Sequence, residues 1–159
     1  ISYDWIFQYP NNDVGVTYSH MIHIEKMRYK ENVLLAASWQ ASGAGCEGDP
    51  GQHLRFSISS DGGATWSPSK CVMYALQAVW SPILHFHAET GVLFLFYSET
   101  RKVASPGGDI KVIESSDAGD TWSEPRTIMT HEADGGVPKV LANKLCVTSS
   151  GAKVLANKL

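Results

Sequence analysis

Residues 59–66 read SSDGGATW, and residues 115–122 read SSDAGDTW. Both stretches fit the pattern S-x-D-x-G-x-T-W, so five positions are specified twice in one chain. A short carboxylate can accept hydrogen bonds from turn amides, glycine allows a backbone with positive φ, and the hydroxyls can bond to the local backbone. The pattern therefore predicts two tight hairpin turns, each anchored by a packed tryptophan.

Alternation of apolar and polar residues surrounds both turns, and helical periodicity of useful length is hard to find. Apolar runs at residues 33–37 and 92–97 are typical of inner strands covered on both faces. Gly, Pro, Asp and Asn divide the rest into short segments. We expect strands near residues 20–27, 32–39, 53–60, 70–75, 80–88, 92–99, 109–116, 126–130 and 137–149.

The order of these strands repeats: two strands joined by a short turn, a longer loop, a third strand, an Asp-rich turn and a fourth strand. Asp61 and Asp117 stand 56 residues apart, close to the ~40–50-residue periods of propeller repeats. Radial arrangement of four-stranded sheets protects their edge strands. The sequence therefore predicts an all-β fold, a partial β-propeller of four-stranded antiparallel blades.

One domain covering residues 1–159 is expected, with two to three blades. Because propellers use ~4–8 blades, further blades or another chain would have to complete the ring. The last seven residues repeat residues 139–145 letter for letter, and no prediction is built on them. The expected parts are a remnant of a preceding blade (1–19), two blades (20–75 and 80–130) and the start of a third (137–159).

Composition excludes several classes of protein. The chain is 43% hydrophobic and 18% charged, as in folded globular proteins. Its net charge is -3 and its basic residues are scattered, so no nucleic-acid partner is expected. The longest apolar run, residues 92–97, is far shorter than the ~20 residues that cross a bilayer, so no membrane span is expected.

The doubled S-x-D-x-G-x-T-W pattern, placed at the same point of two strand repeats, resembles the Asp-box (BNR) repeat of the sialidase or neuraminidase family. The resemblance implies a six-bladed propeller in which the boxes are stabilising turns far from the active site. It implies an exo-glycosidase that acts without a cofactor on a terminal acidic sugar of a glycoconjugate. It also favours an extracellular or secretory location.

The resemblance implies that an acid/base carboxylate lies in the loop leading to the third strand of a blade, here residues 41–52. Glu47 and Asp49 lie in this loop, and two nearby carboxylates can push one another's pKa apart. The alternative is a solvated glycine-rich turn. Register with the family places the acid/base position near His53, a residue that could titrate near neutral pH or simply serve the strand.

Substrate-lining residues are expected around the same end of the blades. Trp39 offers a sugar-stacking face, and the corresponding loop of the second unit adds further polar groups. None of the four arginines stands in the sequence context of the family's arginine triad, so a non-catalytic glycan-binding module or structural subunit remains an alternative. The candidate substrate-binding residues are Trp39, Gln52, Tyr97, Glu99 and Arg101.

No metal site is predicted. His85 and His87 stand two residues apart in one expected strand, with no carboxylate in obvious register to complete a metal site. His20 and His23 have no carboxylate in obvious register. The three cysteines, Cys46, Cys71 and Cys146, lack the close spacing of a zinc or redox motif.

Overall fold

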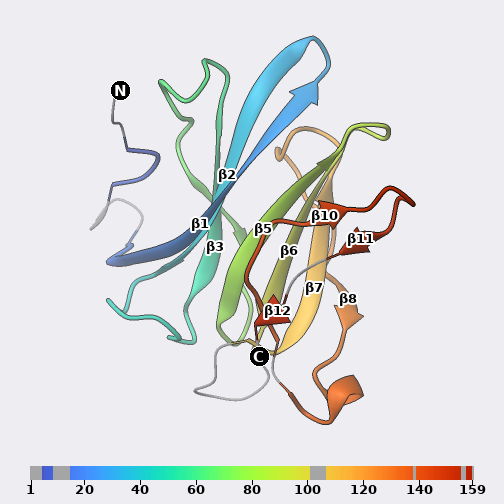
Figure 1. Ribbon diagram of the computed structural model, residues 1–159. Helices are drawn as coiled ribbons and strands as arrows, with labels where there is room; N and C mark the ends of the chain where they lie inside the picture. The colour runs from blue at the N-terminus through green and yellow to red at the C-terminus, as the bar shows by residue number, and fades with distance from the viewer. Residues whose placement is uncertain (1–4, 9–14, 101–106, 138, 155–156, 159) are drawn as a thin grey trace.

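Two four-stranded antiparallel sheets form most of the molecule (Figure 1). The computed structural model describes residues 5–8, 15–100, 107–137, 139–154 and 157–158. Sheet A has the order β1 (Tyr18–Tyr29), β2 (Asn32–Ser42), β3 (His53–Ser59), β4 (Lys70–Met73). Sheet B has the order β5 (Val79–His87), β6 (Val92–Glu99), β7 (Asp109–Ser115), β8 (Arg126–Met129).

The first eight predicted strands and the all-β fold are confirmed. The ninth, expected at residues 137–149, is wrong as a single strand: the chain there forms β9 (Val140–Leu141) and β10 (Cys146–Val147). The chain bends near Asn143, which lets Leu141 and Leu145 pack on sheet B while Lys144 reaches Glu25 of β1. Sequence alternation gave no sign of this bend.

Short elements complete the described chain. A 3₁₀ helix, η2 (Glu132–Asp134), follows β8 and precedes β9. β9 pairs with β12 (Asn157–Lys158), and β10 pairs with β11 (Lys153–Val154). The repeated tail therefore takes part in two short ladders.

The two sheets repeat each other in backbone detail. Their first strands carry a register shift at the same place, between His20 and His23 in β1 and between Trp80 and Ile83 in β5. Within each shift lies a residue with positive φ, Met21 at 54° and Ser81 at 50°. Such a backbone is uncommon for residues other than glycine, and an extra residue of this kind is how a β-bulge bends a strand.

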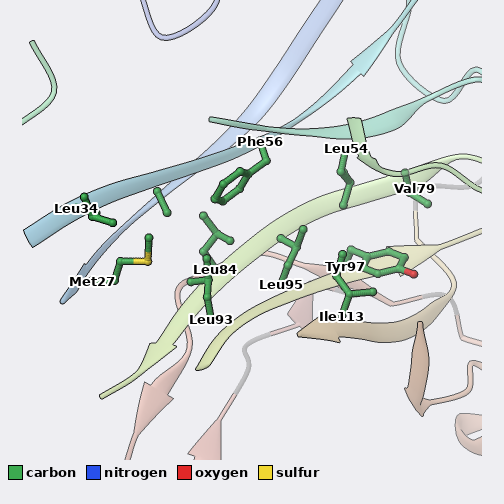
Figure 2. Close-up of a cluster of buried hydrophobic side chains, with 11 residues drawn as sticks. Met27, Leu34, Leu54, Phe56, Val79, Leu84, Leu93, Leu95, Tyr97 and Ile113 are labelled. Atoms are coloured by element: carbon green, nitrogen blue, oxygen red, sulfur yellow. The ribbon is translucent and has the colours of Figure 1, made fainter. Parts of the chain in front are cut away.

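Three apolar clusters form the core, one between the two sheets and one on the far face of each sheet. The largest lies between one face of sheet A and one face of sheet B, and Figure 2 shows side chains of the two sheets meeting there. The far face of sheet B is covered by Leu141 and Leu145, and the far face of sheet A by Val16 and its neighbours. The buried side chains of the central cluster are Met27, Leu34, Ala36, Leu54, Phe56, Val79, Leu84, Leu93, Leu95, Tyr97 and Ile113.

Both Asp-rich stretches form the predicted hairpin turns, with closely matching hydrogen bonds. Asp61 accepts from the Ser59 hydroxyl at 2.8 Å, the Thr65 amide at 2.9 Å and the Thr65 hydroxyl at 2.6 Å. Asp117 accepts the same three bonds from Ser115 and Thr121. The threonine hydroxyl and amide hold the pKa of each carboxyl at about 2, so both boxes keep their charge in any ordinary buffer.

The second box also joins the two sheets. Trp122 packs edge-on against Phe56 of β3, with ring centroids 5.4 Å apart. Gly119 lies so close to the same ring that a Cβ there would stand 2.4 Å from Phe56 Cε1. Lys70 of β4 donates to the carbonyl oxygen of Asp120 at 3.0 Å. The box end of sheet B is therefore docked on sheet A.

Replacing Gly119 with alanine should destabilise the protein more than replacing Gly63, its counterpart in the first box. Both glycines have a left-handed φ, +93° and +97°, so both variants carry the same backbone strain. Only Gly119→Ala also collides with Phe56, because the nearest atom to a Cβ at Gly63 is Leu35 Cδ1 at 3.5 Å. We expect Gly119→Ala to lower the free energy of unfolding by about 1–3 kcal/mol more than Gly63→Ala in urea denaturation.

Equal losses in the two variants would contradict the docking role of the second box.

Candidate functional site

Antiparallel strands bring the β2–β3 loop, residues 43–52, to the end of the sheets opposite the two boxes. The start of β1 and the start of β5 lie at the same end. We call this region the loop end. It contains most of the predicted site residues.

Glu47 lies at the loop end with one carboxylate oxygen held and the other open. Its Oε1 accepts from Gln40 Nε2 at 2.7 Å and lies 3.5 Å from His20 Nδ1. The Glu47 side chain is 42% exposed and that of His20 is 54% exposed. Within the described part of the chain, Glu47 Oε2 has no hydrogen-bond partner. Glu47 is thus a positioned carboxylate that can reach a ligand.

Asp49 closes a tight turn in the same loop. Its Oδ1 accepts from the Gly51 amide at 2.7 Å, and its carbonyl oxygen accepts from the Gln52 amide at 2.8 Å. A Cβ at Gly51 would stand 2.8 Å from the Asp49 carboxylate. This is the Asx-turn use of a short acidic side chain, so Asp49 shapes the loop that carries Glu47.

Gln52 is fully buried and bonded at both ends of its amide. It accepts from the Gly48 amide at 2.9 Å and donates to the Val79 carbonyl oxygen of β5 at 2.7 Å. The ring of Trp80 lies directly over Gly48, where a Cβ would stand 3.1 Å from its Cη2. Gln52 therefore fastens the loop to sheet B, and both ends of the amide that was predicted to bind substrate are engaged in these two bonds.

His53 serves the strand and the turn. Its Nδ1 lies 3.0 Å from the Gly51 carbonyl oxygen, an arrangement in which this nitrogen carries the proton and donates. Burial lowers the pKa of His53, the Gly51 hydrogen bond opposes this, and the charge of Arg55 adds to the lowering. The imidazole is therefore neutral at pH 7.

Two predicted aromatic site residues are buried. Trp39 is 2% exposed and packs against Phe7, with ring centroids 5.3 Å apart. Tyr97 is fully buried between the sheets, where its hydroxyl donates to Met73 Sδ at 3.4 Å. Burial, followed by the charge of Glu99, raises the pKa of Tyr97, which is the reverse of what a nucleophile needs. Tyr97 therefore faces the interior between the sheets, whereas Trp39, although buried, contributes to the lining of the cavity described below.

The remaining predicted residues divide between an ion pair and the undescribed part of the chain. Glu99 pairs with Lys111 at 2.7 Å. Arg101 lies outside the described residues. Of the described arginines, Arg55 bonds to Ser69 and Arg126 to Glu114. No arginine in the described chain contacts Glu47 or His20.

Asp109 is a buried carboxylate that the sequence analysis missed. Asp109 is the first residue of β7, just as His53 is the first residue of β3 in the other sheet. Its Oδ1 accepts a hydrogen bond from the His131 amide at 3.0 Å and lies 2.9 Å from His131 Nδ1. The 56-residue spacing of the boxes also separates His53 from Asp109, so the repeat itself could have indicated this position.

His23 and Glu25 of β1 form a second feature that was missed. His23 Nδ1 accepts the Leu84 amide of β5, and Glu25 Oε1 accepts the Phe86 amide, both at 3.2 Å. The other oxygen of Glu25 bonds to Lys144. The alternation of the sequence places His23 and Glu25 on one face of β1. The sequence could not show that β5, the edge strand of sheet B, lies against that face.

An apolar cavity of about 320 Å³ lies on the far side of sheet A. Its lining is Trp5, Ile6, Phe7, Ser19, His20, Met21, Ile22 and Trp39. In the described residues, no group of three or more His, Cys, Asp or Glu is placed to hold a metal ion. None of the helices among the described residues has the length and apolar character needed to cross a membrane.

The all-β fold with paired Asp boxes is typical of BNR-repeat proteins, and comparison with known families identifies the same class. The model of the BNR repeat-like domain matches residues 33–158, and the chain belongs to this sialidase-like BNR-repeat family. No curated protein matches the chain.

A solved structure shares the fold. The structure titled "Hadza microbial sialidase Hz136" is similar with a TM-score of 0.68 and 17% sequence identity. The match covers 90% of this chain and 32% of that chain, so the present chain spans about a third of that protein.

Acid should destabilise the protein below about pH 6.5 because of buried histidines. Burial lowers the pKa of His23 and of His53 in the folded state. Between the ordinary value of 6.5 and these lower values the unfolded chain binds more protons, so the free energy of unfolding falls as the pH falls. The Asp boxes, with pKa values of about 2, contribute no change in this range.

The variant His23→Asn should reduce this acid sensitivity, because an asparagine oxygen can accept the Leu84 amide without titrating. Urea denaturation at pH 7.5 and 5.5 measures the effect. An unchanged pH dependence in this variant would show that His23 is not one of the responsible groups.

Proposed function

We propose that this chain forms part of a sialidase-like glycoside hydrolase that acts on a terminal acidic sugar of glycoconjugates, with Glu47 as its acid/base carboxylate. The observation that carries the proposal is the exposed pair of Glu47 and His20 at the loop end, opposite the structural boxes. In this proposal sheets A and B are two blades of a propeller, corresponding to residues 20–75 and 80–130.

The chemistry of Glu47 supports this role. One oxygen is fixed by Gln40 at 2.7 Å, and the other has no partner in the described chain, so it can exchange a proton with a glycosidic oxygen or a water. His20 lies beside the fixed oxygen, with its Nδ1 3.5 Å from Oε1. Asp49 supplies the loop geometry and is the second carboxylate candidate.

Binding of an acidic sugar also requires cationic groups, which the described loop end does not provide around Glu47. Arg101 is the arginine that the sequence analysis predicted for this role, and further blades or partner chains would supply the rest. A nucleophile is likewise required from elsewhere, because Tyr97 is buried.

A second function is favoured by the burial of Trp39, Gln52 and Tyr97 in structural contacts. With these side chains engaged in structural contacts, the two sheets suit a structural subunit of a larger assembly, or a non-catalytic glycan-binding module whose sugar contacts come from other residues. Other chains that complete the ring would be its partners.

The variant Glu47→Gln separates the two functions. If Glu47 is the acid/base group, this change should lower kcat on a fluorogenic sialoside or uronide by about 100-fold or more, since general acid–base catalysis contributes at least that much. Glu114→Gln is the matched control, because Glu114 is paired with Arg126 away from the loop end and its loss should leave kcat unchanged.

Cleavage that survives Glu47→Gln would rule out the assigned role. Binding of a sialoside or uronide by the assembly that includes the further blades or partner chains, measured by calorimetry, with no cleavage of either, would favour the second function.

A further inference from the structure

Gln40 spans the boundary between the two sheets and is fully buried. Its Oε1 accepts the backbone amide of Ser81 in β5 at 3.0 Å, and its Nε2 donates to Glu47 Oε1 at 2.7 Å. One side chain thus joins sheet B to the exposed carboxylate on sheet A's loop.

The orientation of this amide is fixed by its partners. A backbone N–H can only donate, so the oxygen of Gln40 must face Ser81. The NH₂ group is then directed at Glu47, and a hydrogen bond from a donor to an ionised carboxylate is stronger than one between neutral groups. Reversing the amide would set oxygen against oxygen at Glu47 and donor against donor at Ser81.

The Ser81 amide is available because of the bulge in β5. The register of β5 with β6 shifts between Trp80 and Ile83, and Ser81 takes a positive φ of 50°. Ser81 is 3% exposed, so an unbonded N–H there would be costly. The bulge therefore presents a buried donor at a fixed position, and Gln40 is the acceptor that meets it.

We infer that Gln40 is a positioning residue for Glu47: it fixes the position of the Glu47 carboxylate relative to sheet B. This inference rests on the proposed function for the catalytic meaning of Glu47. Gln40 occupies Oε1 and leaves Oε2 for the ligand, so the carboxylate presents one defined oxygen. Movement of β5 relative to β2 would be transmitted to that carboxylate through two hydrogen bonds.

The side-chain amide signals of Gln40 in ¹H–¹⁵N NMR of the full chain test the geometry without any assay of activity. Glu47→Ala should shift the Gln40 amide proton that faces Glu47 upfield and speed its exchange with water. The Gln52 amide, equally buried but bonded to Gly48 and Val79, is the internal control and should not change. Unchanged Gln40 signals would overturn the inference.

Paired variants test the consequence for catalysis. Gln40→Met removes two buried hydrogen bonds at the loop end, and Ser57→Ala, the control, removes the contacts of a buried hydroxyl with Ser67 beside the first box, away from Glu47. Only Gln40→Met should lower kcat, by about tenfold or more with little change in KM, as expected for loss of a hydrogen bond to a charged group. Equal losses of kcat in both variants would overturn the positioning role.

The placement of Glu47 by Gln40 and the proposed hydrolase activity can be disproved separately. The expected NMR change, with no cleavage of a sialoside or uronide by the assembly that includes the further blades or partner chains, would uphold the placement of Glu47 by Gln40 and defeat the proposed hydrolase. Cleavage that depends on Glu47 with no NMR change would do the opposite.

Discussion

The inner edge of sheet B depends on side chains from sheet A. Strand β5 pairs with β6 on one side, which leaves outward backbone amides at Ser81, Leu84 and Phe86 that no neighbouring strand can bond. Gln40, His23 and Glu25 accept these three amides in order along the edge. Edge strands with free N–H groups tend to pair with other chains, and here side chains complete the edge without adding a strand. The docking of the sheets, the neutral state of His23 and the place of Glu47 all follow from this arrangement.

The opposite end of the sheets is joined in a different way. There the second Asp box presses Gly119 and Trp122 against Phe56, an apolar contact beside a charged turn. The carboxylates of Asp61 and Asp117 are occupied by hydrogen bonds within their own turns. The two ends of the sheets therefore differ: one has hydrogen-bonded turns and aromatic packing, and the other has polar, partly exposed side chains. The candidate site belongs to the second end because a ligand can reach it there.

Sequence patterns predicted the fold more completely than the site. The boxes and the alternation of β1 to β8 depend on local chemistry, which a sequence displays directly. Glu47 and Asp49 were found because they lie in one loop. The roles of Gln40 and Gln52 depend on residues 41 and 27 positions away, and the burial of Tyr97 depends on a facing sheet. The bend near Asn143 likewise depends on packing against sheet B rather than on residue order.

The contact between Glu25 and Lys144 shows how little separation along the chain costs once the sheets have assembled. The two residues are 119 positions apart, whereas His23 and Leu84 are 61 apart. Because the entropy of closing a loop grows with the logarithm of its length, this near doubling adds only about 0.6 kcal/mol. The chain can therefore return from residue 144 to its first strand at almost the same entropic cost as joining the two neighbouring sheets, so contacts between distant segments limit this fold little more than contacts between adjacent ones.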